Sequence, residues 1–377
     1  MGERKLTPLS IGRLTARVPI IQGGMGVGIS LSGLASAVAN AGGIGVISAA
    51  GIGMLEDDFR SNFREANLRA LRRELRTAKE ASDGPIGVNI MVALSDSDAL
   101  MNAAIEEGAD LLLLGAGLPL KAPSGLTTDG LHDTPTGFVP IVSSGRAIKV
   151  LFRYWAKAYD RVPDAVVVEG PMAGGHLGFR REELDDPAHG LERLVADALA
   201  AVAPYEERFD RSIPVIAAGG VFDGADIHRM LSLGASGVQM ATRFVATHEC
   251  DAAPAFKDAY VACTEADLTI IDSPVGLPGR AIRNRFLDEV ASGRRRPTRC
   301  AWTCLVTCNP TESPYCIARA LTEAKLGHLD EGFAFAGANA HRVEEIVSVA
   351  DLVDSLIRGY EAAAMSAERG GPELVRR

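Results

Sequence analysis

The chain has 377 residues, of which 47% are hydrophobic and 5% aromatic, and 40 are glycines. This length allows either two domains or one barrel with additions, and so apolar a chain can bury a large core. The net charge of −9 lacks the basic excess of nucleic-acid-binding proteins. No apolar run approaches the roughly 18 residues that span a bilayer, and residues 1–5 do not begin a secretion signal. We therefore expect a cytoplasmic protein with no nucleic-acid and no membrane partner.

Eight short apolar runs recur along the first 240 residues, and helical patterns separate most of them. Strands are expected at residues 19–22, 45–48, 86–91, 110–114, 139–143, 165–168, 213–217 and 236–240. Helices are expected over residues 32–41, 57–81, 96–107, 146–158, 191–203 and 224–233. Such alternation implies right-handed crossovers and a parallel sheet. Eight strands, several followed by glycines, favour an α/β fold of the (β/α)8 TIM-barrel type over a doubly wound open sheet.

The remaining chain predicts additions to this barrel. Residues 119–140 are rich in proline and polar residues, which indicates a surface insertion or a functional loop. We expect three parts: a barrel over residues 1–250, a smaller lid or substrate domain over 251–335 and a C-terminal return to the barrel over 336–377. The lid would include a cysteine-rich segment at 300–316, and the return a final amphipathic helix over 346–363.

The most informative stretch runs from Asp164 to Phe179. Four apolar residues, 165–168, read as a buried strand, and a glycine-rich turn then presents one imidazole, that of His176. A ring that titrates near neutrality, just past a strand end, stands where α/β folds place their chemistry. The alternative is a tight turn with a surface histidine.

Two turns of small residues follow the last two predicted strands, at 217–220 and 239–242. In a barrel the loops after the seventh and eighth strands form a recurring phosphate site, in which backbone N–H groups face the anion. Met25, in the turn after the first strand, would place its backbone beside a flat ring. Asn89 would offer its amide to ring heteroatoms, or simply cap its strand.

These motifs resemble, in order and spacing, those of the nitronate monooxygenase (2-nitropropane dioxygenase-like) flavoproteins, whose superfamily includes the flavin-dependent enoyl-ACP reductases. The similarity covers roughly residues 15–290 and a tail at 333–339. It rests on Pro-Ile-Ile-Gln-Gly-Gly-Met (19–25), Gly-Val-Asn (87–89), Glu-Gly-Pro-Met-Ala-Gly-Gly-His (169–176), Ala-Gly-Gly (218–220) and Gly-Val-Gln-Met-Ala-Thr-Arg-Phe (237–244).

The resemblance implies an FMN-dependent barrel enzyme with a substrate cleft beneath a lid. By position it makes His176 the catalytic residue. It implies cofactor contacts from Gly23, Gly24, Met25, Asn89, Glu169, Gly174, Gly175, Gly219, Gly220, Gln239, Met240, Ala241 and Thr242.

Three features depart from the nitronate monooxygenase pattern. Glu169 stands where those enzymes typically carry glutamine and looks more like the enoyl reductase branch, as does the stretch 274–284. Ala241 replaces a usual glycine. The cysteine-rich insert belongs to neither enzyme as usually described.

Four cysteines fall within 17 residues, at Cys300, Cys304, Cys308 and Cys316. In a reducing cytoplasm this favours metal binding or redox work over disulfides. Structural zinc prefers Cys-x2-Cys pairs, which are absent, whereas a 4Fe-4S cluster spreads its cysteines further apart. We expect an iron–sulfur centre, with zinc, thiol redox chemistry and inert buried thiols as alternatives.

Together these features predict an FMN oxidoreductase with NAD(P)H as the donor and a small or acyl-chain acceptor, such as an enoyl thioester or a quinone. The first alternative is oxidation of alkyl nitronates by oxygen. Others are a non-catalytic flavin or iron–sulfur electron carrier and a phosphate-binding barrel isomerase without flavin. The sequence is compatible with a homodimer.

Overall fold

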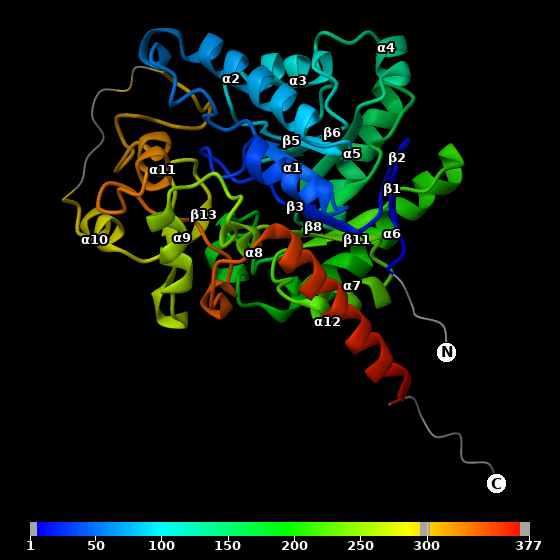
Figure 1. Cartoon of the computed structure of the whole chain (residues 1–377). Helices are drawn as coiled ribbons and strands as arrows, with labels where there is room; N and C mark the ends of the chain where they lie inside the picture. The colour runs from blue at the N-terminus through cyan, green and yellow to red at the C-terminus, as the bar shows by residue number, and fades with distance from the viewer. Residues whose placement is uncertain (1–5, 295–299, 301, 370–377) are drawn as a thin grey trace.

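Eight parallel strands form the centre of the protein, which a computed structural model describes over residues 6–294, 300 and 302–369 (Figure 1). The strands are β3 (Ile20–Gln22), β4 (Gly45–Ser48), β5 (Ile86–Met91), β6 (Leu111–Gly115), β7 (Gly137–Val142), β8 (Val166–Glu169), β10 (Val215–Ala218) and β11 (Gly237–Met240). They pair in the order β4-β5-β6-β7-β8-β10-β11-β3. The ends of this row meet, because Ile44 N donates to Ile20 O and Gln22 N to Ile44 O, each at 2.9 Å. The predicted barrel is confirmed.

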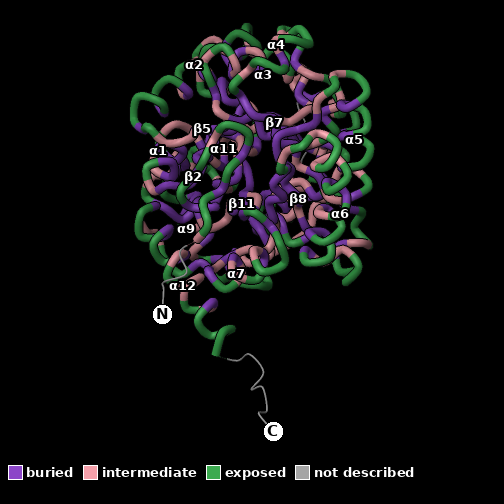
Figure 2. Tube along the Cα trace, turned by 90° about the vertical axis from the view of Figure 1, so that its right-hand side faces the viewer, coloured by how far each residue is buried: buried purple, intermediate pink, exposed green. Residues whose placement is uncertain are grey.

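Helices cover the outside of the barrel, and the buried part of the chain lies inside them (Figure 2). They are α1 (Ser32–Asn40), α2 (Phe59–Ala81), α3 (Ser97–Glu106), α5 (Gly145–Ala158), α6 (Leu191–Phe209) and α7 (Gly224–Ser232). In α5 the residues Ile148, Leu151, Phe152 and Trp155 recur at helical spacing and are all buried. Helix α6 continues past the predicted end at 203. Its extension is packed on α5, because the ring of Tyr205 stands edge to face against Phe152, with 5.3 Å between the ring centres.

The floor of the barrel is closed by an N-terminal hairpin that the sequence did not reveal. Strands β1 (Leu9–Ile11) and β2 (Leu14–Ala16) pair antiparallel. Leu9, Ile11 and Ala16, each about 1% exposed, join the cluster inside the barrel. The hairpin therefore completes the packing of the barrel interior at this end.

The segment after the last barrel strand folds beside the barrel. It contains α8 (Thr242–Val245), α9 (Pro254–Val261), β12 (Leu268–Asp272), β13 (Pro278–Ile282), α10 (Arg285–Ala291) and α11 (Ile317–Lys325). Helices α9, α10 and α11 gather on one side of the molecule (Figure 1). The short strand β9 (Gly175–His176) leaves the barrel turn after β8 and pairs with β13. The three-part division stays a prediction, and residues 370–377 lie outside the described range.

Two further helices complete the fold. Helix α4 (Thr128–Asp133) lies within the stretch that was expected to be a loop. The final helix α12 (Val349–Arg369) packs on α7, where a Cβ on Gly224 would lie 2.1 Å from Tyr360 N. This close approach leaves no room for a side chain at Gly224 where the two helices meet.

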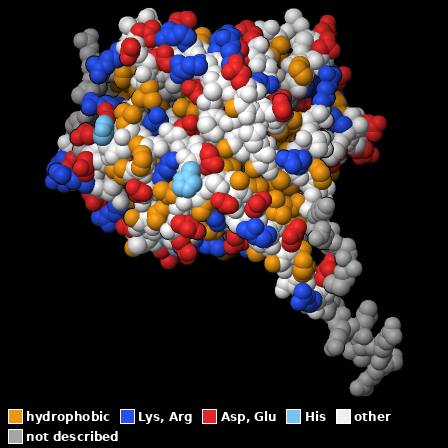
Figure 3. Space-filling view, viewed as in Figure 1, with side chains coloured by type: hydrophobic (Ala, Val, Ile, Leu, Met, Phe, Trp, Pro, Cys, Tyr) orange, Lys and Arg blue, Asp and Glu red, His pale blue; other side chains and the backbone are white. Residues whose placement is uncertain are grey.

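Acidic and basic side chains are interspersed on the face shown in Figure 3. None of the helices in the described ranges combines the length and apolar character needed to cross a bilayer.

A buried carboxylate, that of Asp164, connects several elements at the floor of the barrel. Asp164, 4% exposed, accepts a hydrogen bond from Phe138 N at 2.8 Å and pairs with Arg161 and Arg211 at 2.8 Å each. It thus ties the start of β8 to β7 and to the end of α6. Removal of one member of such a buried network leaves the other charges uncompensated.

We expect Asp164→Ala to lower the free energy of unfolding by about 3 kcal/mol or more, measured by urea denaturation. The matched control is Asp272→Ala, which breaks an ion pair with Arg181 at a carboxylate that is 90% exposed. That control should cost less than about 1 kcal/mol. Equal losses in both variants would contradict the structural role of Asp164.

Candidate functional site

A cavity of about 740 Å³ lies where the barrel strands end. Its floor and walls come from the turns after β3, β4, β5, β6, β7, β8 and β11. Its other walls come from the segment after the barrel, including Phe256, Tyr260, Leu277, Leu321 and Phe335. The cavity thus stands between the carboxyl ends of the strands and the added segment, which is where barrels bind their ligands.

The structure brings the predicted cofactor residues together around this cavity and a smaller one beside it. The large cavity is lined by Gly23, Gly24, Met25, Asn89, Glu169, Gly174, Gly175, Gln239, Ala241 and Thr242, and by the predicted catalytic His176. The smaller cavity, of about 60 Å³, adds Gly219, Gly220 and Met240. The two cavities share Glu169, Gly174, Gln239, Ala241 and Thr242. The roles of these residues remain predictions, but the residues themselves all line these two adjoining cavities.

His176 is positioned by strand pairing rather than by a loose turn. Strand β9 pairs antiparallel with β13, so that His176 lies opposite Gly279 and Gly175 opposite Arg280. The His176 ring makes a hydrogen bond of 2.7 Å between Nε2 and Ser273 Oγ. It packs edge to face against Phe335, with 5.0 Å between the two ring centres. The added segment therefore fixes the imidazole over the barrel.

Burial determines the charge of His176. It lowers the pKa of the imidazole to about 4, so the ring is neutral near pH 7. A neutral imidazole carries one donor and one acceptor nitrogen. It can therefore accept a proton from an acidic carbon or donate a hydrogen bond to a carbonyl oxygen.

Glu169, the last residue of β8, lies in the wall of both cavities. Burial raises the pKa of its carboxyl group to about 7. A carboxyl group that titrates near neutrality can hold or release a proton during turnover. Glu169 and His176 thus place two proton-handling groups in one cavity, both uncharged at mildly acidic pH.

Arg280 braces the turn between these two residues. Its Nη1 donates to Pro171 O at 2.6 Å and to Ala173 O at 2.8 Å. Arg280 stands on β13, so one side chain of the added segment holds the backbone that joins Glu169 to His176.

The cavity wall suits a flat ring that carries hydrogen-bonding atoms. Two buried oxygens, Ser48 Oγ and Gln239 Oε1, have no hydrogen-bond partner within the described part of the chain. Asn89 donates through Nδ2 to Leu113 O at 3.1 Å, which leaves its Oδ1 as an acceptor. A Cβ on Gly24 would lie 2.3 Å from Asn89 Cβ, so a side chain there would displace Asn89.

The small cavity suits a phosphate group. The turn after β10 contains Gly219 and Gly220 at φ +85° and +100°, a backbone conformation that favours glycine. A Cβ on Gly219 would also approach Gly170 O to 2.7 Å. Backbone N–H groups in such turns bind anions without a charged side chain.

The four clustered cysteines lie in an irregular segment that docks on the rim of the large cavity. Val306 N donates to Ala93 O and Ser95 N to Cys304 O, at 2.9 and 3.0 Å. Thr307, between two of the cysteines, lines the cavity. Burial, with added repulsion from the other three thiols, raises the pKa of Cys304 to about 12.

The expected metal centre at Cys300, Cys304, Cys308 and Cys316 is not supported. No three His, Cys, Asp or Glu side chains in the described ranges are placed to hold a metal ion. Two of the thiols make protein contacts instead, since Cys300 Sγ accepts from Thr303 N at 3.4 Å and Cys308 Sγ lies 3.5 Å from Ser313 Oγ. Cys304 and Cys308 also pack against the core as partly buried side chains.

Sequence reasoning missed the residues that the added segment contributes. Ser273, Phe335 and Tyr260 surround His176 or the cavity from strands, loops and helices that gave no clear pattern. The tail at 333–339 was noticed only through the family resemblance. It includes Phe335 and Gly337 in the cavity wall and Asn339 beside the small cavity.

Comparison with known proteins places this site in a family. The family model described as nitronate monooxygenase matches residues 8–359. The chain belongs to the nitronate monooxygenase family. It is accordingly an FMN-dependent oxidoreductase.

Individual members of the superfamily differ in activity. The chain is 32% identical to the nitronate monooxygenase of Pseudomonas aeruginosa, over 73% of this chain and 80% of that protein. It is 30% identical to a carboxyl-CoA dehydrogenase of Mycobacterium tuberculosis, (3aS,4S,5R,7aS)-5-hydroxy-7a-methyl-1-oxo-octahydro-1H-indene-4-carboxyl-CoA dehydrogenase. That match spans 74% of this chain and 66% of the dehydrogenase. The structure of FabK from Thermotoga maritima superimposes with a TM-score of 0.73 at 27% identity, over 94% and 96% of the two chains.

The pKa of Glu169 gives a pH-dependent prediction for the flavin-free protein. The folded protein holds this proton up to about pH 7, whereas the ordinary pKa is 4.5. The stabilisation from Glu169 is therefore complete below about pH 4.5 and is lost as the pH rises through about 7. Glu169→Gln stays uncharged, so its Tm should rise relative to the wild type across this range and then level off.

Differential scanning fluorimetry between pH 4.5 and 8 measures this difference. Glu182→Gln, at a side chain that is 66% exposed, serves as the control and should show a constant offset from the wild type. A constant offset for Glu169→Gln as well would contradict the raised pKa.

Proposed function

We propose that this protein is an NAD(P)H-dependent reductase that acts on an activated alkene carried by an acyl thioester. The observation that carries the proposal is the apolar wall of the large cavity. Beyond the residues assigned to the flavin, this wall includes Val27, Ile29, Met91, Leu118, Ile141, Val142, Phe256, Val275, Leu277, Leu321 and Phe335. Apolar side chains from both the barrel and the added segment suit an acyl chain, whereas a small alkyl nitronate has little apolar surface to bury.

The likeness to two relatives supports the same class of substrate. FabK is an enoyl-ACP reductase, and the Mycobacterium tuberculosis relative is named for a carboxyl-CoA compound. Glu169, in place of the glutamine typical of nitronate monooxygenases, is a feature shared with the reductase branch. The iron–sulfur centre expected from the sequence is not part of the proposal, because no metal-binding group is found among the described residues.

The cavity residues fit FMN, which would supply the two-electron chemistry when bound. Gln239, Ser48 and Asn89 would offer oxygens to the ring, and the turns at 219–220 and 241–242 would hold the phosphate. Neutral His176 would donate a hydrogen bond to the thioester carbonyl and polarise the conjugated C=C bond. In the net reaction NAD(P)H and one proton reduce this bond to a single bond. Glu169, which holds its proton up to about pH 7, would supply that proton.

The test compares two reactions on one preparation. Without oxygen we expect NADH or NADPH to be consumed with 2-enoyl thioesters. The kcat/KM should be about tenfold higher or more for an eight-carbon than for a four-carbon chain, because each buried CH2 contributes about 0.8 kcal/mol. Oxygen uptake with ethyl nitronate that needs no NAD(P)H, together with inert enoyl thioesters, would overturn the proposal.

Nitronate oxidation is the second candidate, and the neutral His176 favours it. With a pKa of about 4 the imidazole is unprotonated at ordinary pH, so a ring nitrogen has a lone pair for a carbon-bound proton, but the same shift makes it a weak base. The 32% identity to the Pseudomonas aeruginosa enzyme points the same way.

His176→Ala tests whether the protein is a catalyst at all, rather than an electron carrier. We expect turnover to fall about 10²-fold to 10⁴-fold, the usual contribution of an acid–base group, while FMN remains bound. His132→Ala is the control, since that ring contacts Tyr159 O on the outside of the barrel. Unchanged turnover in His176→Ala with bound FMN would eliminate the assigned role of His176.

A further inference from the structure

The small cavity has a fourth wall that lies far along the chain from the other three. Three of its walls are the turns after β8, β10 and β11. The fourth consists of Gly337 and Asn339, about a hundred residues after the last barrel strand. We call residues 336–339 the strap.

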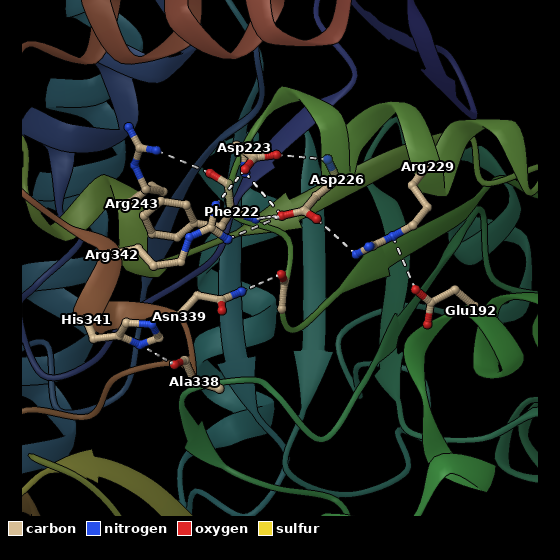
Figure 4. A network of polar contacts seen from close by, with 11 residues as sticks. Glu192, Phe222, Asp223, Asp226, Arg229, Arg243, Ala338, Asn339, His341 and Arg342 are labelled. Atoms are coloured by element: carbon tan, nitrogen blue, oxygen red, sulfur yellow. Dashed lines mark hydrogen bonds and ion pairs between the residues drawn. The ribbon is translucent and has the colours of Figure 1, made fainter. Parts of the chain in front are cut away.

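The strap is hydrogen-bonded to each of the three turns. Asn339 Nδ2 donates to Gly220 O at 2.8 Å, in the turn after β10 (Figure 4). Gly337 N donates to Thr242 Oγ1 at 3.1 Å, in the turn after β11. Ala338 N donates to Met172 O at 3.0 Å, in the turn after β8. One short segment therefore sets the spacing of all three turns.

The packing leaves little freedom at these contacts. A Cβ on Gly174 would lie 2.6 Å from both Ala336 C and Gly337 N. A Cβ on Gly337 would lie 2.9 Å from Thr242 Oγ1. The strap thus rests directly on the backbone at Gly174 and on the hydroxyl group of Thr242, with no room for an added side chain at either glycine.

The chain just beyond the strap is locked to the same β10 turn. The Arg342 guanidinium stacks 4.3 Å from the centre of the Phe222 ring and pairs with Asp223 Oδ2 at 2.7 Å. Arg243 stacks on the same ring at 4.6 Å and donates to Phe222 O at 3.3 Å. Figure 4 shows these side chains gathered around Phe222. The position of the strap is therefore fixed from its far end as well.

We propose that the strap retains the phosphate end of FMN and that Asn339 is its main positioning residue. The Asn339 amide holds the Gly220 carbonyl oxygen. In a trans peptide the C=O and the following N–H point in opposite directions, so this bond also sets where Val221 N–H points. Backbone N–H groups bind a phosphate only when they converge on it. Asn339 acts through this backbone, and it does so whichever reaction the enzyme catalyses.

The test measures binding of two flavins to the flavin-free protein by fluorescence quenching. Riboflavin has the ring of FMN but no phosphate. We expect Asn339→Ala to raise the Kd for FMN about tenfold or more and the Kd for riboflavin less than about twofold, because only the phosphate end loses its preorganised donors. The preference for FMN over riboflavin would fall accordingly.

Asn40→Ala is the matched control. Asn40 Nδ2 donates to Ala81 O at 3.1 Å on the outside of the barrel, so this variant loses the same kind of bond away from the cavity and should bind both flavins as the wild type does. Asn339→Asp places a carboxylate beside the Gly220 carbonyl oxygen. It should weaken FMN binding more than Asn339→Ala does.

Two results would overturn the proposal. One is an equal loss of affinity for FMN and riboflavin, which would make the strap a general structural element. The other is unchanged binding of both. If neither variant folds, hydrogen exchange on the wild type decides the matter: FMN should slow exchange at Gly337 and Ala338 N–H more than riboflavin does, and equal protection would refute the strap's role.

Discussion

The site depends on one short antiparallel ladder between parts of the chain that are about a hundred residues apart. Residues Gly175 and His176 leave the barrel turn after β8 and pair with Gly279 and Arg280 on β13. The ladder sets the direction of the imidazole, and through Arg280 it also holds the turn that carries Glu169. Without it, the turn would be a flexible glycine-rich loop on top of the barrel. The added segment therefore builds the reactive part of the site as well as covering it.

Burial in this site shifts the pKa values of two titratable groups in opposite directions. Both shifts favour the uncharged form of the group. The pKa of Glu169 rises and that of His176 falls, so each group favours its neutral form. Where no charged group lies close to the reacting atoms, the local dielectric is low, and a hydrogen bond to a polarised carbonyl is stronger than in water. The charged residues near the small cavity, Arg243 and Arg342, are occupied with Phe222 and Asp223 at its outer side.

The barrel could be predicted from the sequence because its strands are buried on both faces and therefore appear as continuous apolar runs. A continuous run such as residues 165–168 leaves few alternatives to a central parallel strand. The hairpin of β12 and β13 was not predictable in this way. Its residues are mostly half-buried, and its partner β9 has only two residues, so neither alternation nor length marks it. Ser273, which contacts His176, was missed for the same reason.

The cysteines show a different limit of sequence reasoning. Their clustering suggested a metal centre, but the segment that carries them lies at the cavity rim and no metal-holding group is found among the described residues. Spacing along the chain does not determine where sulfur atoms point, however. In the structure Cys300 and Cys308 face a backbone N–H and a hydroxyl group. Metal binding requires a particular arrangement of the ligand atoms, which only tertiary packing determines, and the described side chains do not provide it.

The order in which the walls of the cavity occur along the chain has a consequence for biosynthesis. The eight barrel strands are complete at Met240, yet Phe335, Ala336 and Gly337 still form part of the cavity wall. During translation the barrel can close while its upper face is open to water. The cavity reaches its final shape only after residues 335–337 have left the ribosome and folded onto the barrel. The complete cofactor site therefore forms later than the barrel strands themselves.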